Sequence, residues 1–173
     1  MNSQQFDDLG IFLAHSATLE REAAERFYEL AAMMQVHNND ELHRLFLELA
    51  RYSVEHVNEV EEICKGYQLP ALKPWDYQWP GDDAPENLAY EQVHYLLSPV
   101  AALDIVHRVE LSAEAFYRKV SIESTNEDVR RFAQLFAAEE HEHAETAKAM
   151  QQQYQQRQKP DQNLDLDPPV MPE

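Results

Sequence analysis

Apolar residues recur every three or four positions along four long stretches of this sequence. Such spacing places them on one face of a helix, so it predicts four amphipathic helices. The stretches are separated by segments rich in Asn, Asp, Ser, Thr and Pro, residues that cap or interrupt helices. We expect the helices at about 8–35, 40–66, 99–123 and 125–156, with a further short helix within 88–97.

The connections between these helices predict how they pack. Only a few residues separate the first helix from the second and the third from the fourth, which forces two antiparallel hairpins. Residues 67–87 combine several prolines with both tryptophans of the chain, so we expect an irregular crossover that joins the hairpins. The predicted fold class is an all-α four-helix bundle. We assign 1–157 to this domain and 158–173 to a disordered, acidic, proline-containing tail.

The composition supports this fold and limits the partners. The 173 residues include only 3 glycines, and the length suits one domain. The net charge of −18 argues against nucleic acid and anionic membranes, because both are bound through clustered Lys and Arg. Cys64 is the single cysteine, which excludes an internal disulfide and a four-cysteine metal site on this chain. The sequence has no signal-like or membrane-spanning apolar segment, so we expect a cytoplasmic location.

Each apolar stripe is interrupted near its middle by a side chain that can bind a metal. The first and third stripes contain Glu20 and Glu110, the second contains His56, and the fourth contains Glu140 and His143. An unpaired carboxylate in a dry core costs several kcal/mol, so such groups pair, take up a proton or bind a metal. These five residues are our candidate metal ligands. The alternative is a buried hydrogen-bonded layer without metal.

The spacing of Glu140 and His143 sharpens this hypothesis. A Glu three residues before a His puts both side chains on one face of a helix, one turn apart. Bundles that bind two iron or manganese ions use two such Glu-x-x-His pairs and one Glu from each of the other helices. The chain supplies five of these six positions, because His56 lacks its Glu partner. Matching intervals in the two hairpins also indicate an internal duplication.

At these residues the chain resembles the rubrerythrin-like branch of the ferritin-like superfamily. The resemblance covers about 8–152 and rests on 110–117 (ELSAEAFY) and 140–143 (EHEH), with a weaker match at 20–27 (EREAAERF). It implies a ferritin-like bundle with a di-iron centre that reduces hydrogen peroxide. In the family, electrons often come from a rubredoxin domain on the same chain, and that domain is missing here. The resemblance therefore implies a separate electron donor, such as a rubredoxin, and a homodimer.

Three positions depart from the family pattern. Ser53 stands where the resemblance calls for a second bridging Glu, and a neutral hydroxyl is a poor ligand for a divalent ion. Phe27 replaces a Tyr, and Ala113 stands where rubrerythrins commonly have a further Glu. We therefore expect a second ion to be held less tightly and peroxide chemistry to be less efficient. Four residues near the ligand layer could substitute for the missing Glu: His107, Glu55, Glu59 and Glu114.

These observations lead to one hypothesis and one alternative. The hypothesis is a non-haem iron oxidoreductase that binds one or two iron ions, or manganese or zinc, and acts on hydrogen peroxide or dioxygen. Tyr117 is the candidate catalytic residue, and we favour a hydrogen-bonding role beside the ligands over a radical or acid role. The alternative is a non-catalytic protein with a degenerate site that sequesters or senses metal, or that supports a partner protein. This alternative accounts for Ser53, Phe27 and Ala113 together.

Overall fold

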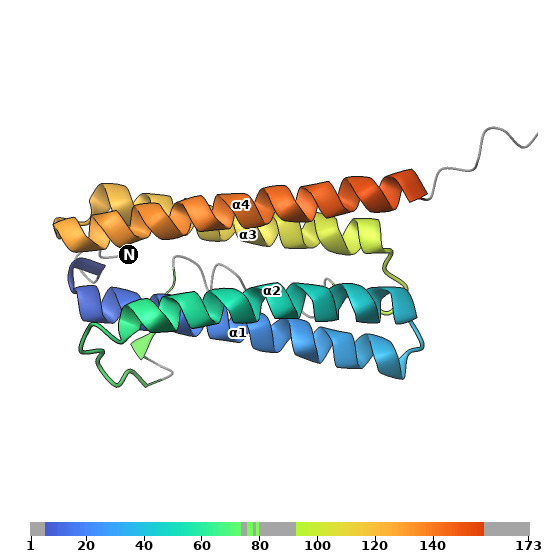
Figure 1. Ribbon diagram of the computed structural model, residues 1–173, viewed down its shortest axis with the longest axis horizontal. Helices are drawn as coiled ribbons and strands as arrows, with labels where there is room; N and C mark the ends of the chain where they lie inside the picture. The colour runs from blue at the N-terminus through green and yellow to red at the C-terminus, as the bar shows by residue number, and fades with distance from the viewer. Residues whose placement is uncertain (1–5, 74–75, 78, 80–92, 158–173) are drawn as a thin grey trace, which may run out of the picture.

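The described part of the chain is a bundle of four α-helices without strands. The computed structural model describes residues 6–73, 76, 77, 79 and 93–157. The helices are α1 (Leu9–Val36), α2 (Asp40–Cys64), α3 (Pro99–Glu123) and α4 (Glu127–Arg157). Figure 1 shows α1 alongside α2 and α3 alongside α4, as two antiparallel hairpins stacked on each other. The predicted all-α four-helix bundle is confirmed.

Three sequence predictions concern segments outside these helices. The predicted disordered tail, 158–173, lies outside the described residues, as does most of the predicted crossover. The predicted short helix within 88–97 is wrong for the part that is described. From Val93 onward the chain forms a turn, closed by a 2.9 Å hydrogen bond from the Leu97 N–H to the His94 carbonyl.

Side-chain caps fix where the helices begin. In the first three helices a side-chain oxygen accepts a hydrogen bond from the N–H three residues later: Asp8 at 3.0 Å, Asn39 at 3.1 Å and Ser98 at 3.2 Å. The fourth helix begins at Glu127, two residues later than predicted. The reason is Asp7, whose carboxylate accepts the Thr125 N–H at 2.7 Å and the Thr125 hydroxyl at 3.0 Å. Asn126 then caps α4 by accepting the N–H two residues later at 3.0 Å.

The interior consists of two apolar clusters, one toward each end of the bundle. One cluster contains Leu30, Phe46 and Leu103, and the other contains Phe12 and Phe136. Fully burying a Leu or Phe side chain stabilises a fold by about 1.5–3 kcal/mol. The clusters therefore hold the helices in register on both sides of the bundle's middle, where the polar interruptions of the four stripes lie.

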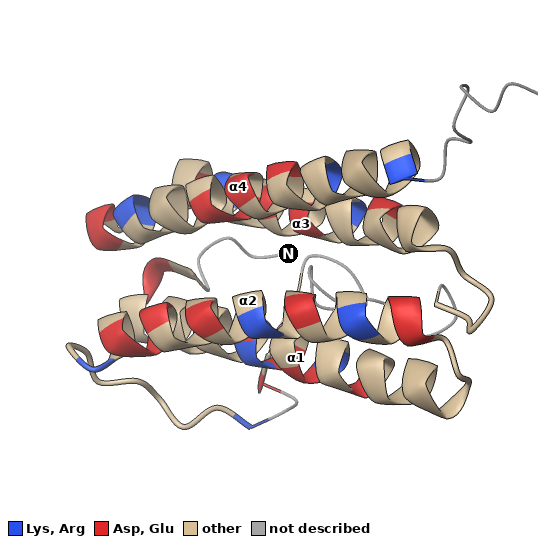
Figure 2. Ribbon diagram, turned by 45° about the vertical axis from the view of Figure 1, so that its right-hand side comes forward, with Lys and Arg blue, Asp and Glu red and all other residues tan. Residues whose placement is uncertain are grey.

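The outer surface carries the excess negative charge. Figure 2 shows Asp and Glu along all four helices, with fewer Lys and Arg interspersed among them. Cys64 is a buried free thiol at the end of α2. Of the helices that the structure describes, none combines the length and the apolar character needed to cross a lipid bilayer.

Candidate metal centre

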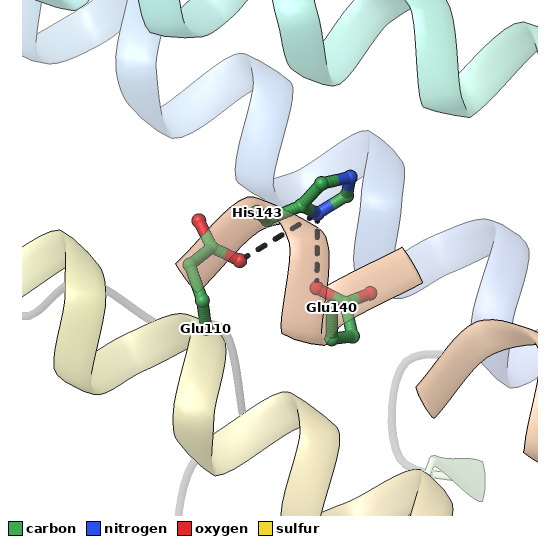
Figure 3. Close-up of side chains that lie close together, drawn as sticks. All are labelled: Glu110, Glu140 and His143. Atoms are coloured by element: carbon green, nitrogen blue, oxygen red, sulfur yellow. Dashed lines mark hydrogen bonds and ion pairs between the residues drawn. The ribbon is translucent and has the colours of Figure 1, made fainter. Parts of the chain in front are cut away.

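Glu110 on α3 and Glu140 and His143 on α4 form a compact group in the middle of the bundle. One ligand atom from each residue lies within 4.8 Å of the other two. The His143 Nδ1 atom is 3.1 Å from a Glu140 carboxylate oxygen and 3.9 Å from a Glu110 carboxylate oxygen. Figure 3 shows both carboxylates directed at the same ring nitrogen. The structure thus brings together the three ligands predicted on the second hairpin, and this group could hold a metal ion.

The first hairpin contributes the other two predicted ligands to the same layer. Glu20 is buried, with 6% of its surface exposed, and it shares a hydrogen bond with Glu140. The His56 Nε2 atom lies 2.6 Å from the Nε2 atom of His143. The other ring nitrogen of His56 is 3.4 Å from a Glu59 carboxylate oxygen. All five predicted ligands therefore lie together, and Glu59, one of the possible substitutes, contacts this layer through His56.

Burial sets the protonation of this layer. It raises the pKa of Glu20 to about 8, with the charge of Glu110 as the next cause. It also raises the pKa of Glu110 to about 7, although a hydrogen bond with Glu140 opposes the rise. The pKa of His143 is lowered to about 4, mainly by burial and secondly by the neighbouring His56. At pH 7 Glu20 therefore keeps its proton and Glu110 is partly protonated, whereas the His143 ring is neutral and has a lone pair to offer.

The donor set fits a divalent cation. Carboxylate oxygens of Glu110 and Glu140 lie within 4 Å of the His143 ring, whose neutral imidazole brings no positive charge at pH 7. A cation can replace the retained protons and neutralise the buried carboxylates. Carboxylate oxygens combined with imidazole nitrogen suit iron, manganese and zinc.

A cavity of about 390 Å³ adjoins the ligand layer at Ser53. The Ser53 hydroxyl donates a 3.3 Å hydrogen bond to the Leu49 carbonyl on its own helix. From the layer the cavity extends to apolar side chains, and it is bordered on α4 by acidic ones. Its lining includes Ala23, Phe27, Val106, Ala147, Glu139 and Glu142. The position predicted to lack a bridging Glu therefore faces open space rather than a replacement ligand.

One solved structure is similar over most of the chain. It is the COG1633 protein of Magnetospirillum magnetotacticum MS-1, described as an uncharacterized conserved protein. The two share 32% sequence identity over 88% of this chain and 95% of that chain, with a TM-score of 0.60. The chain belongs to the COG1633 family. No family model matches the sequence, and no curated protein matches it. The COG1633 description names no activity, so the chemistry of the site is the basis for a functional proposal.

The cavity of this COG1633 protein includes an acidic residue that the sequence analysis missed. Glu139 lines the cavity, and burial, reinforced by the charges of Glu59 and Glu142, raises the pKa of Glu139 to about 7. Its position directly before Glu140 was visible in the sequence. A helical stripe assigns neighbouring residues to different faces, however, so the pattern gave no reason to place both near the site.

Tyr117, the predicted catalytic residue, lies in the aromatic part of the core. It is fully buried, and its ring centroid is 5.4 Å from that of Phe136 and 6.1 Å from that of Phe12. It follows Glu110 by about two helical turns on α3. Its hydrogen-bonding or catalytic role stays a prediction.

The structure also places the other residues that were considered for the family resemblance. Phe27 lines the cavity, whereas Ala113 is fully buried. Glu114, considered as a substitute ligand, instead pairs with Arg118 and with the His141 ring at 3.2 Å. These contacts account for Glu114 without a metal.

Proposed function

We propose that this chain is a rubrerythrin-like, non-haem iron protein that reduces hydrogen peroxide or dioxygen with electrons from a separate donor such as a rubredoxin. Its metal ions would be held by Glu110, Glu140 and His143, with Glu20 and His56 completing the layer. Consistent with the resemblance in 8–152, we further propose that it works in the cytoplasm as a homodimer.

The single observation that carries this proposal is the buried group of Glu110, Glu140 and His143 between two apolar clusters. Glu140 is 1% exposed, and the side chains of Glu110 and His143 are 13% and 23% exposed. Three buried or nearly buried polar side chains cost stability unless they serve as partners for one another or for a ligand. Their convergence at one point, on the predicted spacing, favours a ligand role.

The residues of this layer can support redox chemistry in three ways. They hold the ion: the neutral His143 ring and the carboxylates offer nitrogen and oxygen donors. They exchange protons for the ion, because the raised pKa values of Glu20 and Glu110 in the metal-free protein, about 8 and about 7, let both carboxyl groups release a proton near neutral pH as metal binds. They also border the cavity at Ser53, which leaves room for an oxidant beside the layer. When bound, ferrous iron supplies the electrons that reduce an O–O bond.

The alternative remains a non-catalytic protein that sequesters or senses metal, or that supports a partner protein. Two observations favour it. Ser53 bonds to its own helix, so the second ion position lacks a carboxylate, and Tyr117 packs among aromatic rings. A metal-binding protein of this kind would bind a single ion, centred on Glu110, Glu140 and His143, and would sequester or sense metal.

Metal content per chain tests the proposal. The protein is loaded anaerobically with iron, manganese or zinc, loosely bound ions are removed, and elemental mass spectrometry gives the stoichiometry. We expect one to two iron ions per chain, an oxo-bridged diferric absorption band after exposure to air, and peroxide turnover with an added reductant. One retained ion without band or turnover would favour a non-catalytic metal-binding protein, and no retained ion would exclude the proposal and leave only a protein that supports a partner. Glu145→Gln, an exposed substitution on α4, is the matched control.

A further inference from the structure

The cavity beside Ser53 is larger than peroxide or dioxygen requires. Its volume is about 390 Å³. Sites for organic ligands typically measure about 300–1,000 Å³, whereas a water molecule in the liquid occupies about 30 Å³. A cavity of this size in contact with the ligand layer has room for an organic molecule.

The lining changes character along the bundle axis. Glu20, His56, Glu110 and His143 line one end. One to two helical turns away on each helix, the lining becomes apolar, with Phe27, Leu49, Val106 and Ala147. On α1 the seven residues from Glu20 to Phe27 correspond to about 10 Å along the axis. The cavity therefore fits an extended molecule with a polar head and an apolar tail.

The number of carboxylates determines the charge of that head. Glu20, Glu110 and Glu140 supply three negative charges, whereas two divalent ions carry four positive charges. Ser53 contributes a neutral hydroxyl, so the carboxylates in contact with two such ions leave one positive charge for a coordinating ligand to balance, before the nearby charges of Glu139 and Glu142 are counted. Glu139 and Glu142, which border the cavity, repel an anion when no ion is present. An anionic head should therefore bind only to the metal-loaded site.

We propose that this cavity binds a small unbranched monocarboxylic acid. Its carboxylate takes the ligand position that Ser53 leaves open, and its tail lies along Ala23, Phe27 and Leu49. This inference rests on the proposed function, because it requires ions held by Glu110 and its neighbours. It goes further by assigning an organic ligand of defined chemistry to the site.

Calorimetric titration of the zinc-loaded protein tests the inference without relying on activity. The probes are acetate, hexanoate and 1-hexanol. We expect hexanoate to bind on the order of ten- to a hundredfold more tightly than acetate, because its additional methylene groups are buried. We expect 1-hexanol to bind at least about tenfold more weakly than hexanoate, because it lacks the negative charge. The metal-free protein should bind none of the carboxylates.

Two variants separate the head from the tail. Ser53→Glu places a carboxylate of the protein in the open position, so it should weaken acetate and hexanoate alike, by about tenfold or more. Ala23→Leu fills part of the apolar wall, so it should weaken hexanoate by about tenfold and leave acetate unchanged. Ser112→Glu, on the exposed side of α3, is the matched control and should change neither affinity. Thermal unfolding confirms that each variant is folded.

The outcomes distinguish this inference from the proposed function. Zinc retention without hexanoate binding, or equal hexanoate affinity in wild type, Ser53→Glu and Ala23→Leu, overturns the inference and leaves the metal site intact. Equal affinity for hexanoate and 1-hexanol overturns the carboxylate assignment. Failure to retain zinc, iron or manganese overturns both the inference and the proposed function.

Discussion

The two hairpins meet at one polar layer, but they contribute to it unequally. On α3 and α4, Glu110, Glu140 and His143 converge so that their ligand atoms lie within 4.8 Å of one another. Glu140 also shares a hydrogen bond with Glu20 from the first hairpin, so its carboxyl group links both halves. The second hairpin therefore contains the best-assembled part of the candidate site.

The first hairpin has Ser53 and His56 at the positions that correspond to Glu140 and His143. Ser53 bonds to the carbonyl of its own helix at 3.3 Å, and the His56 Nε2 atom faces the His143 ring at 2.6 Å. His56 has no carboxylate one turn earlier on α2 with which to form a Glu-x-x-His pair. A single Ser in place of a Glu thus leaves one half of a repeated site incomplete, and a cavity lies beside this Ser.

The largest effect should come from removing the carboxylate that links the hairpins. We expect Glu140→Gln to reduce metal affinity on the order of 100-fold, because the neutral amide cannot compensate the charge of an ion. We expect Glu20→Gln, on the first hairpin, to reduce it only about tenfold. Chelator competition with the zinc-loaded proteins measures both values, and circular dichroism checks the fold. Equal losses in the two variants would contradict the proposed inequality of the hairpins.

Restoring the missing carboxylate should make the hairpins more alike. We expect Ser53→Glu to raise the affinity for a second iron ion by about tenfold and to increase peroxide turnover, because it supplies a bridging ligand. Without metal, the same variant should be less stable by about 1–3 kcal/mol, since one more carboxylate is buried. Iron stoichiometry and turnover are measured beside the Ser112→Glu control. Unchanged binding and rate would reject the assignment of position 53 to the metal site.

The metal-free protein should lose stability as the pH rises from about 6.5 to 8. Glu20 and Glu110 have folded pKa values of about 8 and about 7, raised from 4.5, so the folded state holds protons that the unfolded chain has already released. Their stabilising contribution is full below pH 4.5 and declines toward pH 8, and Glu139 acts in the same direction. His143, with a pKa lowered from 6.5 to about 4, acts in the opposite direction, but only below about pH 6.5.

Differential scanning calorimetry between pH 6.5 and 8 measures this effect. We expect the Tm of the metal-free protein to fall by a few degrees over this range. Metal loading should remove the decline, because the ion replaces the protons, and Glu20→Gln should reduce it in the metal-free protein. A Tm of the metal-free wild type that does not change with pH would contradict the raised pKa values of Glu20 and Glu110.

The smallest effect should come from Tyr117, which lies in the core rather than in either half of the site. We expect Tyr117→Phe to change stability by about 1 kcal/mol or less, because its ring contacts with Phe12 and Phe136 remain. Metal content should be unchanged and turnover should fall a few-fold at most. Loss of turnover by more than about tenfold at constant metal content would instead establish a chemical role for the hydroxyl.

Much of the fold was predictable because helices are encoded locally. The three-to-four-residue spacing of apolar positions located all four helices, and Ser98 before Pro99 marked the start of α3. The start of α4 was placed two residues too early because Thr125 is bound by Asp7, which is more than 100 residues away in sequence. A contact of that range leaves no periodic signal.

The candidate ligands were predictable for the same local reason. Glu110, Glu140 and His143 interrupt apolar stripes, and polar residues on a buried face are unusual enough to be recognised without coordinates. The sequence also has Ser at position 53, and this residue was the basis for predicting that one carboxylate is missing. The sequence by itself therefore determined the five candidate ligands and the missing carboxylate, but not the position of Glu139 beside them.

The tertiary structure decided how that layer is organised in space. His56 contacts His143, and Glu139 lines the cavity wall. The cavity beside Ser53 has a volume of about 390 Å³, and Tyr117 packs in the aromatic core. These features depend on the rotation of each helix about its axis and on the separation of the hairpins. Both quantities are set by the packing of many side chains from distant parts of the chain, so a pattern read along one helix cannot specify them.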